Sequence, residues 1–149
     1  MSNNNLSFSF GGLNKESINK HIISLLEIER HTSFSSWDKK NFTVELELKD
    51  VLSFILFIDE EVAGFSILSQ KTKDCVHLHR FCLAKKWQGR GIGKIMMAES
   101  IKRAKTIKAS YFSLKVPVDN QQGLNFYNNF NFKDLFIQDD YFFKVLCLM

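Results

Sequence analysis

The stretch that decides the fold runs from residue 75 to residue 107 and reads CVHLHRFCLAKKWQGRGIGKIMMAESIKRAKTI. Its first part, Cys75 to Ala84, is apolar at most positions and predicts a buried strand. Its last part, from about Gly91 to Ile107, has apolar residues at helical spacing and predicts an amphipathic helix. A glycine-rich turn joins the two. The buried stripe of the helix is expected to contain Ile92, Ile95, Met96, Ile101 and Ala104.

Periodic patterns outside this unit predict the remaining elements. Before it we expect a strand from Leu6 to Phe10 that stops at Gly11-Gly12, a helix from Asn14 to about Ile28, a second helix capped by Ser35 or Ser36, and a β-hairpin of Val51–Ile58 and Val62–Ser69. After it we expect a strand from Tyr111 to Val116, a helix from Asn120 to Asn129, and strands from Phe132 to Ile137 and from Tyr141 to Leu148.

The resulting order, β-α-α-β-β-β-α-β-α-β-β, predicts an α/β fold with a central mixed sheet and helices on both faces. The middle β-α-β unit should be a right-handed crossover, so strands 75–84 and 111–116 are expected to be parallel neighbours. The chain has one proline, Pro117, and no Gly/Ser-rich linker. We therefore expect residues 1–149 to form a single domain.

Composition favours a globular protein and excludes several classes. Apolar residues make up 45% of the chain, phenylalanine alone contributes 15 residues, and no apolar run is long enough to cross a bilayer. The N-terminal residues lack the pattern of a secretory signal. Cys75, Cys82 and Cys147 are an odd number without metal-ligand spacing. They predict reduced, mostly buried thiols, no metal, and a cytoplasmic location.

The net charge of +4 includes a basic cluster at Lys102, Arg103, Lys105 and Lys108, which at helical spacing marks a solvated face. No basic motif interleaved with aromatic residues accompanies it, which argues against nucleic-acid binding, although a basic nucleic-acid-binding domain stays an alternative. A positive potential also favours a phosphate-rich cofactor.

The turn after the strand consists of Gln88, Gly89, Arg90, Gly91, Ile92, Gly93 and Lys94. Glycines let a ligand approach backbone N–H groups, and a helix N-terminus has unpaired donors and partial positive charge, so this turn suits a pyrophosphate. Neither a Walker A loop nor the G-x-G-x-x-G dinucleotide fingerprint fits the glycine positions. A glycine-rich turn that binds nothing is the remaining alternative.

The pattern Gln-x-x-Gly-x-Gly after a strand resembles the acetyl-CoA pyrophosphate loop of the GNAT superfamily of N-acetyltransferases. The order of elements is also that of the GNAT fold, so the resemblance covers nearly all of the chain. A second segment matches at Asn120, Gly123, Asn125-Phe126-Tyr127, Phe130 and Phe132. The resemblance implies the GNAT fold and an N-acetyltransferase activity. Acetyl-CoA would be the cosubstrate, and an amine would be the acceptor.

The same resemblance implies roles for individual residues. Asn120 would bind the pantetheine arm, with Phe126 in the same cofactor-binding segment, and Tyr127 would protonate the departing thiolate. The backbone of Phe81, Cys82 and Leu83 would pair with the arm, and one N–H would face the thioester oxygen. The strand 111–116 would splay away there and open the cofactor slot.

His77 and His79 are candidates for the base that accepts the proton of the amine. They are two residues apart on a predicted strand, so both side chains face one side, and an imidazole accepts protons near neutral pH. The pair is similar to the His-x-His of arylalkylamine N-acetyltransferases, where it relays the proton. Packed core histidines are the alternative reading; a metal site is not favoured because two ligands are too few.

The N-terminal segment from Leu26 to Trp37 resembles the ribosomal-protein alanine N-acetyltransferases, which carry a glutamate base in the strand after the long helix. Lys115 occupies that place here, and a charged lysine is no base, so either His77 substitutes or the substrate differs. Four acidic residues lie in the region that lines the acceptor groove in this family. They either bind a cationic amine or form a solvated face: Glu27, Glu29, Glu45 and Glu47.

Direct attack of the amine on acetyl-CoA in a ternary complex is the expected mechanism, because no base stands beside Cys82 in the sequence to activate its thiol. A non-catalytic acyl-CoA-binding sensor or partner-recruiting module is the alternative. The sequence does not identify the acceptor, which could be a protein N-terminus, a lysine side chain, a polyamine, an aminoglycoside or an aromatic amine. The oligomeric state, monomer or homodimer, is also left open.

Overall fold

The computed structural model describes residues 5–31 and 36–149. Its elements, in chain order, are β1 (Phe8–Gly12), α1 (Lys15–Arg30), α2 (Lys39–Thr43), α3 (Lys49–Leu52), β2 (Phe54–Ile58), β3 (Glu61–Thr72), β4 (Cys75–Leu83), the 3-10 turn η1 (Lys85–Trp87), α4 (Ile92–Thr106), β5 (Tyr111–Pro117), α5 (Gln121–Asn128), β6 (Lys133–Gln138) and β7 (Tyr141–Cys147). The predicted mixed α/β fold is confirmed.

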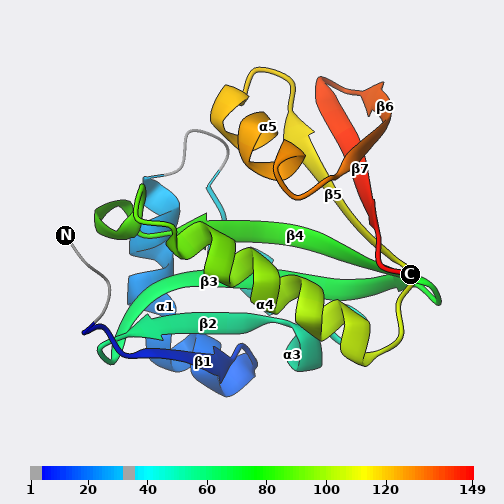
Figure 1. The fold of residues 1–149 in the computed structure, drawn as a ribbon. Coiled ribbons are helices and arrows are strands. Elements are labelled where there is room, and N and C mark those ends of the chain that lie inside the picture. Colours follow the sequence, from blue (N-terminus) through cyan, green and yellow to red (C-terminus); the bar gives the residue numbers. More distant parts are fainter. Residues whose placement is uncertain (1–4, 32–35) are drawn as a thin grey trace.

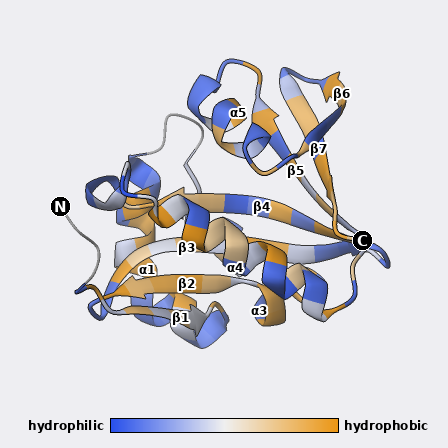
Figure 2. Ribbon diagram, in the orientation of Figure 1, coloured by the Kyte–Doolittle hydropathy of each residue, from blue (hydrophilic) through white to orange (hydrophobic). Residues whose placement is uncertain are grey.

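Within the described residues the strands form one seven-stranded sheet in the order β1-β2-β3-β4-β5-β7-β6. All neighbours are antiparallel except β4 and β5, which are parallel and joined through α4, as predicted. Helices α1 and α4 lie on opposite faces of the sheet (Figure 1). The strands between them, β2 and β3, are apolar along most of their length, as expected for strands covered on both faces (Figure 2).

The N-termini of the first two helices are fixed by capping boxes, in which two side chains and two backbone N–H groups bond reciprocally. Asn14 and Ser17 form the box of α1, as the predicted start implies. Asp38 and Asn41 form the box of α2. The prediction of a cap at Ser36 is wrong, because the Ser36 hydroxyl donates to the carbonyl of Glu29. The alternative cap, Ser35, lies outside the described residues.

Two predicted strand boundaries are displaced, the end of β1 and the start of β2. β1 extends through Gly11 and Gly12, which pair with Ile55 and Phe54, instead of stopping before them. Gly11 belongs in this strand because a Cβ there would lie 2.7 Å from the ring of Phe57. The strand expected from Val51 begins at Phe54, since the preceding residues form the short helix α3.

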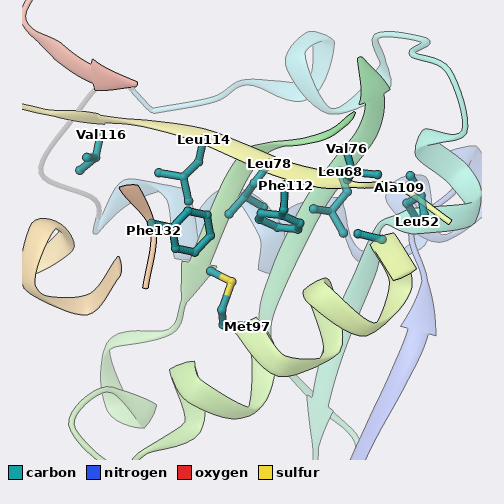
Figure 3. Close-up of a cluster of buried hydrophobic side chains, with 11 residues drawn as sticks. Leu52, Leu68, Val76, Leu78, Met97, Ala109, Phe112, Leu114, Val116 and Phe132 are labelled. Atoms are coloured by element: carbon teal, nitrogen blue, oxygen red, sulfur yellow. The ribbon is translucent and has the colours of Figure 1, made fainter. Parts of the chain in front are cut away.

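The core on the α4 face joins α4 to the parallel strands. Figure 3 shows Met97 of α4 pointing toward Phe112 and Leu114 of β5, with Phe132 beside them. The predicted helix stripe was partly wrong, because Ile95 is 40% exposed. The stripe that is buried consists of Ile92, Met96, Met97, Ser100 and Ala104.

A bulge in β4 changes which residues face each helix. Ile67 of β3 pairs with Arg80 and Leu68 with Leu78, so His79 is the extra residue. Before the bulge the even-numbered Val76 and Leu78 join the cluster under α4, and after it the odd-numbered Phe81 does. As a result Arg80 and Cys82 lie on the α1 face.

Candidate active site

The parallel strands β4 and β5 are paired at one end and apart at the other. Among the described residues three pairs join them: Cys75 with Tyr111, Val76 with Phe112, and His77 with Ser113. β5 then turns toward β7 and α5, while β4 continues along β3 (Figure 1). The β4 backbone beyond His77, including Phe81 to Leu83, is therefore not paired with β5.

The two histidines lie together at this divergence. Their ring centres are 4.8 Å apart in an edge-on arrangement, so both face one side as predicted. The Nδ1 of His77 lies 2.7 Å from the hydroxyl of Ser113, and the Nε2 of His79 lies 2.6 Å from that of Ser69. These hydroxyls orient the two rings.

Burial keeps both histidines neutral. It is the main cause that lowers the pKa of His77 from 6.5 to about 3, with the charges of His79, Lys71 and Lys115 adding to it. Burial, followed by Lys71 and Lys49, lowers the pKa of His79 to about 4. Neutral imidazoles can accept a proton, although with low basicity.

A buried ion pair lies beside the histidines on the α1 face. Glu29 is fully buried and accepts two hydrogen bonds from Arg80, at 2.8 Å from Nε and 2.6 Å from Nη2. It also accepts the backbone N–H of Trp37, and the Arg80 guanidinium lies 5.7 Å from the Trp37 ring centre. For Glu29 the solvated-face reading is therefore wrong, and its carboxylate is already engaged by a cation. Glu27 is exposed and pairs with Arg30.

Cys82 is a poor nucleophile in this setting. Burial, followed by the charge of Glu29, raises the pKa of its thiol to about 12, and the thiol donates to the Glu29 carboxylate at 3.7 Å. Cys82, Cys75 and Cys147, all within the described part of the chain, are free thiols, as predicted. The expectation that they are mostly buried is wrong for Cys147, which is exposed.

The glycine loop leads into α4 with its backbone donors open. Gly89 and Gly91 have φ of +74° and +79°, and a Cβ on either would meet nothing within 4 Å. No side chain of the described residues caps the N-terminus of α4. The guanidinium of Arg90 lies 4.8 Å from the ring centre of Trp87, which holds a positive charge on this loop. The loop thus combines space, N–H donors and positive charge, which fits a pyrophosphate.

The second predicted segment forms α5. Asn120 caps this helix, with its side-chain oxygen accepting from the N–H of Gly123 at 3.0 Å and its amide nitrogen packed over Gly123. The Phe126 ring lies against Gly93 of the loop and 5.8 Å from the Phe81 ring. This contact joins three of the predicted cofactor-binding segments.

Tyr127 is half-buried among rings, with ring centres 5.4 Å from Phe126 and 5.9 Å from Phe132. Burial, followed by the charge of Cys82, raises its pKa above that of a free phenol. Its hydroxyl therefore carries a proton at neutral pH, as a proton donor must.

A family model for the acetyltransferase (GNAT) family matches residues 22–132, a span that includes the histidine pair, the glycine loop and α5. The chain belongs to the GNAT acetyltransferase family. No curated protein sequence matches it closely.

Solved GNAT structures share the fold at low sequence identity. The ribosomal-protein-S18-alanine N-acetyltransferase of Escherichia coli is 17% identical with a TM-score of 0.79, over 95% of this chain and 94% of that one. The PaiA N-acetyltransferase of Thermoplasma acidophilum, solved with coenzyme A, is 18% identical with a TM-score of 0.76, over 95% and 99%. YncA of Salmonella typhimurium, a putative acetyltransferase solved with acetyl-CoA, is 14% identical with a TM-score of 0.74, over 97% and 94%.

Sequence reasoning missed Ser69 and Ser113, which contact the candidate histidines, and Arg80, which pairs with Glu29. Ser113 could have been found by aligning the two predicted parallel strands, but Ser69 and Arg80 depend on the bulge at His79. In the described ranges, no group of three or more His, Cys, Asp or Glu residues could hold a metal ion. Over the same ranges, none of the helices has the length and apolarity to span a membrane.

Proposed function

We propose that this chain transfers the acetyl group of acetyl-CoA to a primary amine by direct attack in a ternary complex. The observation that carries the proposal is the separation of β4 from β5 beyond His77 and Ser113, which leaves the edge of β4 unpaired. The N-terminus of α4, preceded by the glycine loop, follows β4 in the chain. The family match and the CoA and acetyl-CoA complexes of structural neighbours support the choice of cosubstrate.

Acetyl-CoA supplies an acetyl group activated as a thioester. In our proposal the loop from Gln88 to Lys94 binds the pyrophosphate through backbone N–H groups, and the β4 backbone at Phe81 to Leu83 binds the arm. Asn120 and Phe126 border the arm from α5. One β4 N–H faces the carbonyl oxygen as the negative charge develops there.

The protons move through two groups. His77 accepts the proton that the amine loses, with His79 as the relay to solvent, because His79 is the less buried ring of the contacting pair. Tyr127 donates a proton to the sulfur that leaves. The high pKa of Cys82 and its contact with a carboxylate disfavour an acetyl-cysteine route and support direct attack.

The free thiols of Cys75, Cys82 and Cys147 support a cytoplasmic location, which we include in the proposal. We also propose that residues 1–149 act as one domain, because the site draws on elements from α1 to α5.

The test is Tyr127→Phe, assayed for acetylation of an amine panel and for acetyl-CoA affinity. Removing the proton donor should lower kcat by about a hundredfold or more and leave the dissociation constant for acetyl-CoA within about twofold. The phenyl ring keeps the contacts with Phe126 and Phe132, so folding should be preserved. Acetyl-CoA binding without acetylation by the natural protein would favour a non-catalytic acyl-CoA sensor.

A further inference from the structure

Lysines flank the histidine pair on the strands that supply its serines. On β5, Ser113 contacts His77 and Lys115 follows two residues later. Side chains two apart on a strand share a face and lie about 7 Å apart, so Lys115 projects from the face that carries the histidines. Phe112, Leu114 and Val116 point the other way, into the core under α4. Lys115 is exposed.

Lys71 takes the corresponding position on β3, two residues after Ser69, which contacts His79. The pairing of β3 with β4 is irregular next to it, so strand alternation alone does not place its side chain. Two residues along a strand span about 7 Å, so Lys71 lies close to Ser69 and its contact with His79, and its charge lowers the pKa values of both histidines. Lys71 is also exposed.

Lys115 lies beside three aromatic residues, Tyr141, Phe143 and Phe136, which we call the aromatic wall. Its Nζ lies 4.5 Å from the ring centre of Tyr141, and its partner in the sheet is Phe143 of β7. Phe143 stacks on Phe136 of β6 at 4.6 Å and 18°. The ammonium group is thus positioned over a ring, and the side chain of Lys115 is exposed, so a ligand can reach it.

The charged residues near the histidines include carboxylates as well as cations, and the backbone carbonyl of Glu47 accepts from the N–H of Gln70, next to Lys71. Glu29, the buried carboxylate of this region, is matched by Arg80. The lysine charges acting on the histidine pKa values come from Lys71, Lys115 and Lys49. Lys49 is buried with its Nζ directed at the carbonyls of Phe42 and Val44, so the two cations that can meet a substrate are Lys71 and Lys115. Next to the Lys115 ammonium group a polycationic amine would be repelled and an anion attracted.

We infer that the acceptor carries an anionic group, a carboxylate or a phosphate, next to its amine, and that Lys115 binds this group with help from Lys71. This inference rests on the proposed function, because it assigns the acceptor class of the same acetyltransferase site. The aromatic wall of Tyr141, Phe143 and Phe136 offers an apolar surface next to the cation.

The experiment compares amines that differ in the anion alone. Phenylalanine is paired with 2-phenylethylamine, and phosphoethanolamine with ethanolamine, so the two pairs separate a carboxylate from a phosphate. Acetyl transfer is measured at about pH 8, where both histidines are neutral, so that removing a lysine does not act through their protonation. Binding of each amine to the CoA complex is measured by calorimetry as a readout independent of turnover.

We expect the anionic member of at least one pair to have a kcat/KM about tenfold or more above its partner, the scale of one charge-assisted contact. Lys115→Gln should remove that preference without changing the uncharged partner, and Lys115→Arg should restore it. Lys71→Gln should give a smaller loss. The matched control is Lys102→Gln, which removes one exposed lysine from α4 on the opposite face of the sheet.

Equal rates within both pairs, faster acetylation of spermidine than of either anionic amine, or an equal loss on both members in Lys115→Gln would overturn the inference and leave the acetyltransferase proposal standing. A folded natural protein that binds acetyl-CoA but acetylates none of these amines would instead contradict the proposed transfer reaction.

Discussion

His77 and Ser113 form the last residue pair between β4 and β5, and the Nδ1 of His77 lies 2.7 Å from the Ser113 hydroxyl. The contact orients the imidazole at the point where the strands separate. It also engages Nδ1, so in the proposed reaction Nε2 is the nitrogen that accepts the proton of the amine. Ser113 is thus a positioning residue for His77.

His77→Gln should lower kcat by about a hundredfold, because the substitution removes the group that accepts the proton of the amine. The amide can keep a hydrogen bond to Ser113, so acetyl-CoA affinity should be unchanged. Steady-state kinetics with a calorimetric titration of acetyl-CoA separates the two effects. Unchanged kcat would show that water, and not His77, accepts the proton.

The histidine pair should make stability depend on pH. In the native protein the pKa values are lowered to about 3 for His77 and about 4 for His79, against 6.5 for an unperturbed histidine. Below about pH 6.5 the unfolded chain therefore binds more protons than the native protein, and the free energy of unfolding falls as the pH falls toward 4.

Urea unfolding at about pH 7, 6 and 5 measures this slope. The double substitution His77→Gln and His79→Gln should flatten it, because these titrating groups are gone. Equal slopes in the two proteins would mean that other groups cause the dependence.

The buried pair of Glu29 and Arg80 should matter more for stability than the exposed pair of Glu27 and Arg30. Glu29→Gln leaves the Arg80 charge without its counterion and should cost about 3 kcal/mol of unfolding free energy. Glu27→Gln, on the same helix, should cost less than about 1 kcal/mol because its partner is solvated. Denaturant unfolding of both variants gives the comparison, and equal costs would show that burial does not set the value of the ion pair.

Most of the fold could be predicted because its signals are local. The glycine turn, the helix α4 and the hairpin of β2 and β3 each follow from residues adjacent in sequence. The N-cap of α2 was predicted at the wrong residue because serine and aspartate are both good N-caps. Asp38 caps the helix, while the Ser36 hydroxyl bonds instead to the carbonyl of Glu29 in α1. Val51 reads as strand by propensity, yet the chain turns through α3 before entering the sheet.

The sequence named the residues of the candidate site, whose roles stay predictions, but it did not give the contacts that these residues make. Phe126 of α5 does contact Phe81 of β4 and Gly93 of the glycine loop, so three of the predicted segments lie side by side. Glu29 appeared as one acidic residue among four on a periodic helix, and its burial follows from Arg80, which the bulge at His79 turns toward α1. A bulge adds one residue to one strand and leaves no clear mark in composition, so this pairing was not derivable.

The most direct test of the acetyl-CoA site is a calorimetric titration of the natural protein, Gly91→Gln and Gly91→Glu with acetyl-CoA. Gly91 has a φ of +79°, so both substitutions impose the same backbone strain, and Gly91→Glu alone adds a negative charge. We expect micromolar binding by the natural protein, weaker binding by Gly91→Gln, and a further loss of about a hundredfold in Gly91→Glu, since its carboxylate would face the pyrophosphate. No binding by the folded natural protein, or equal binding by the Gln and Glu variants, would contradict the placement of the cofactor on the glycine loop.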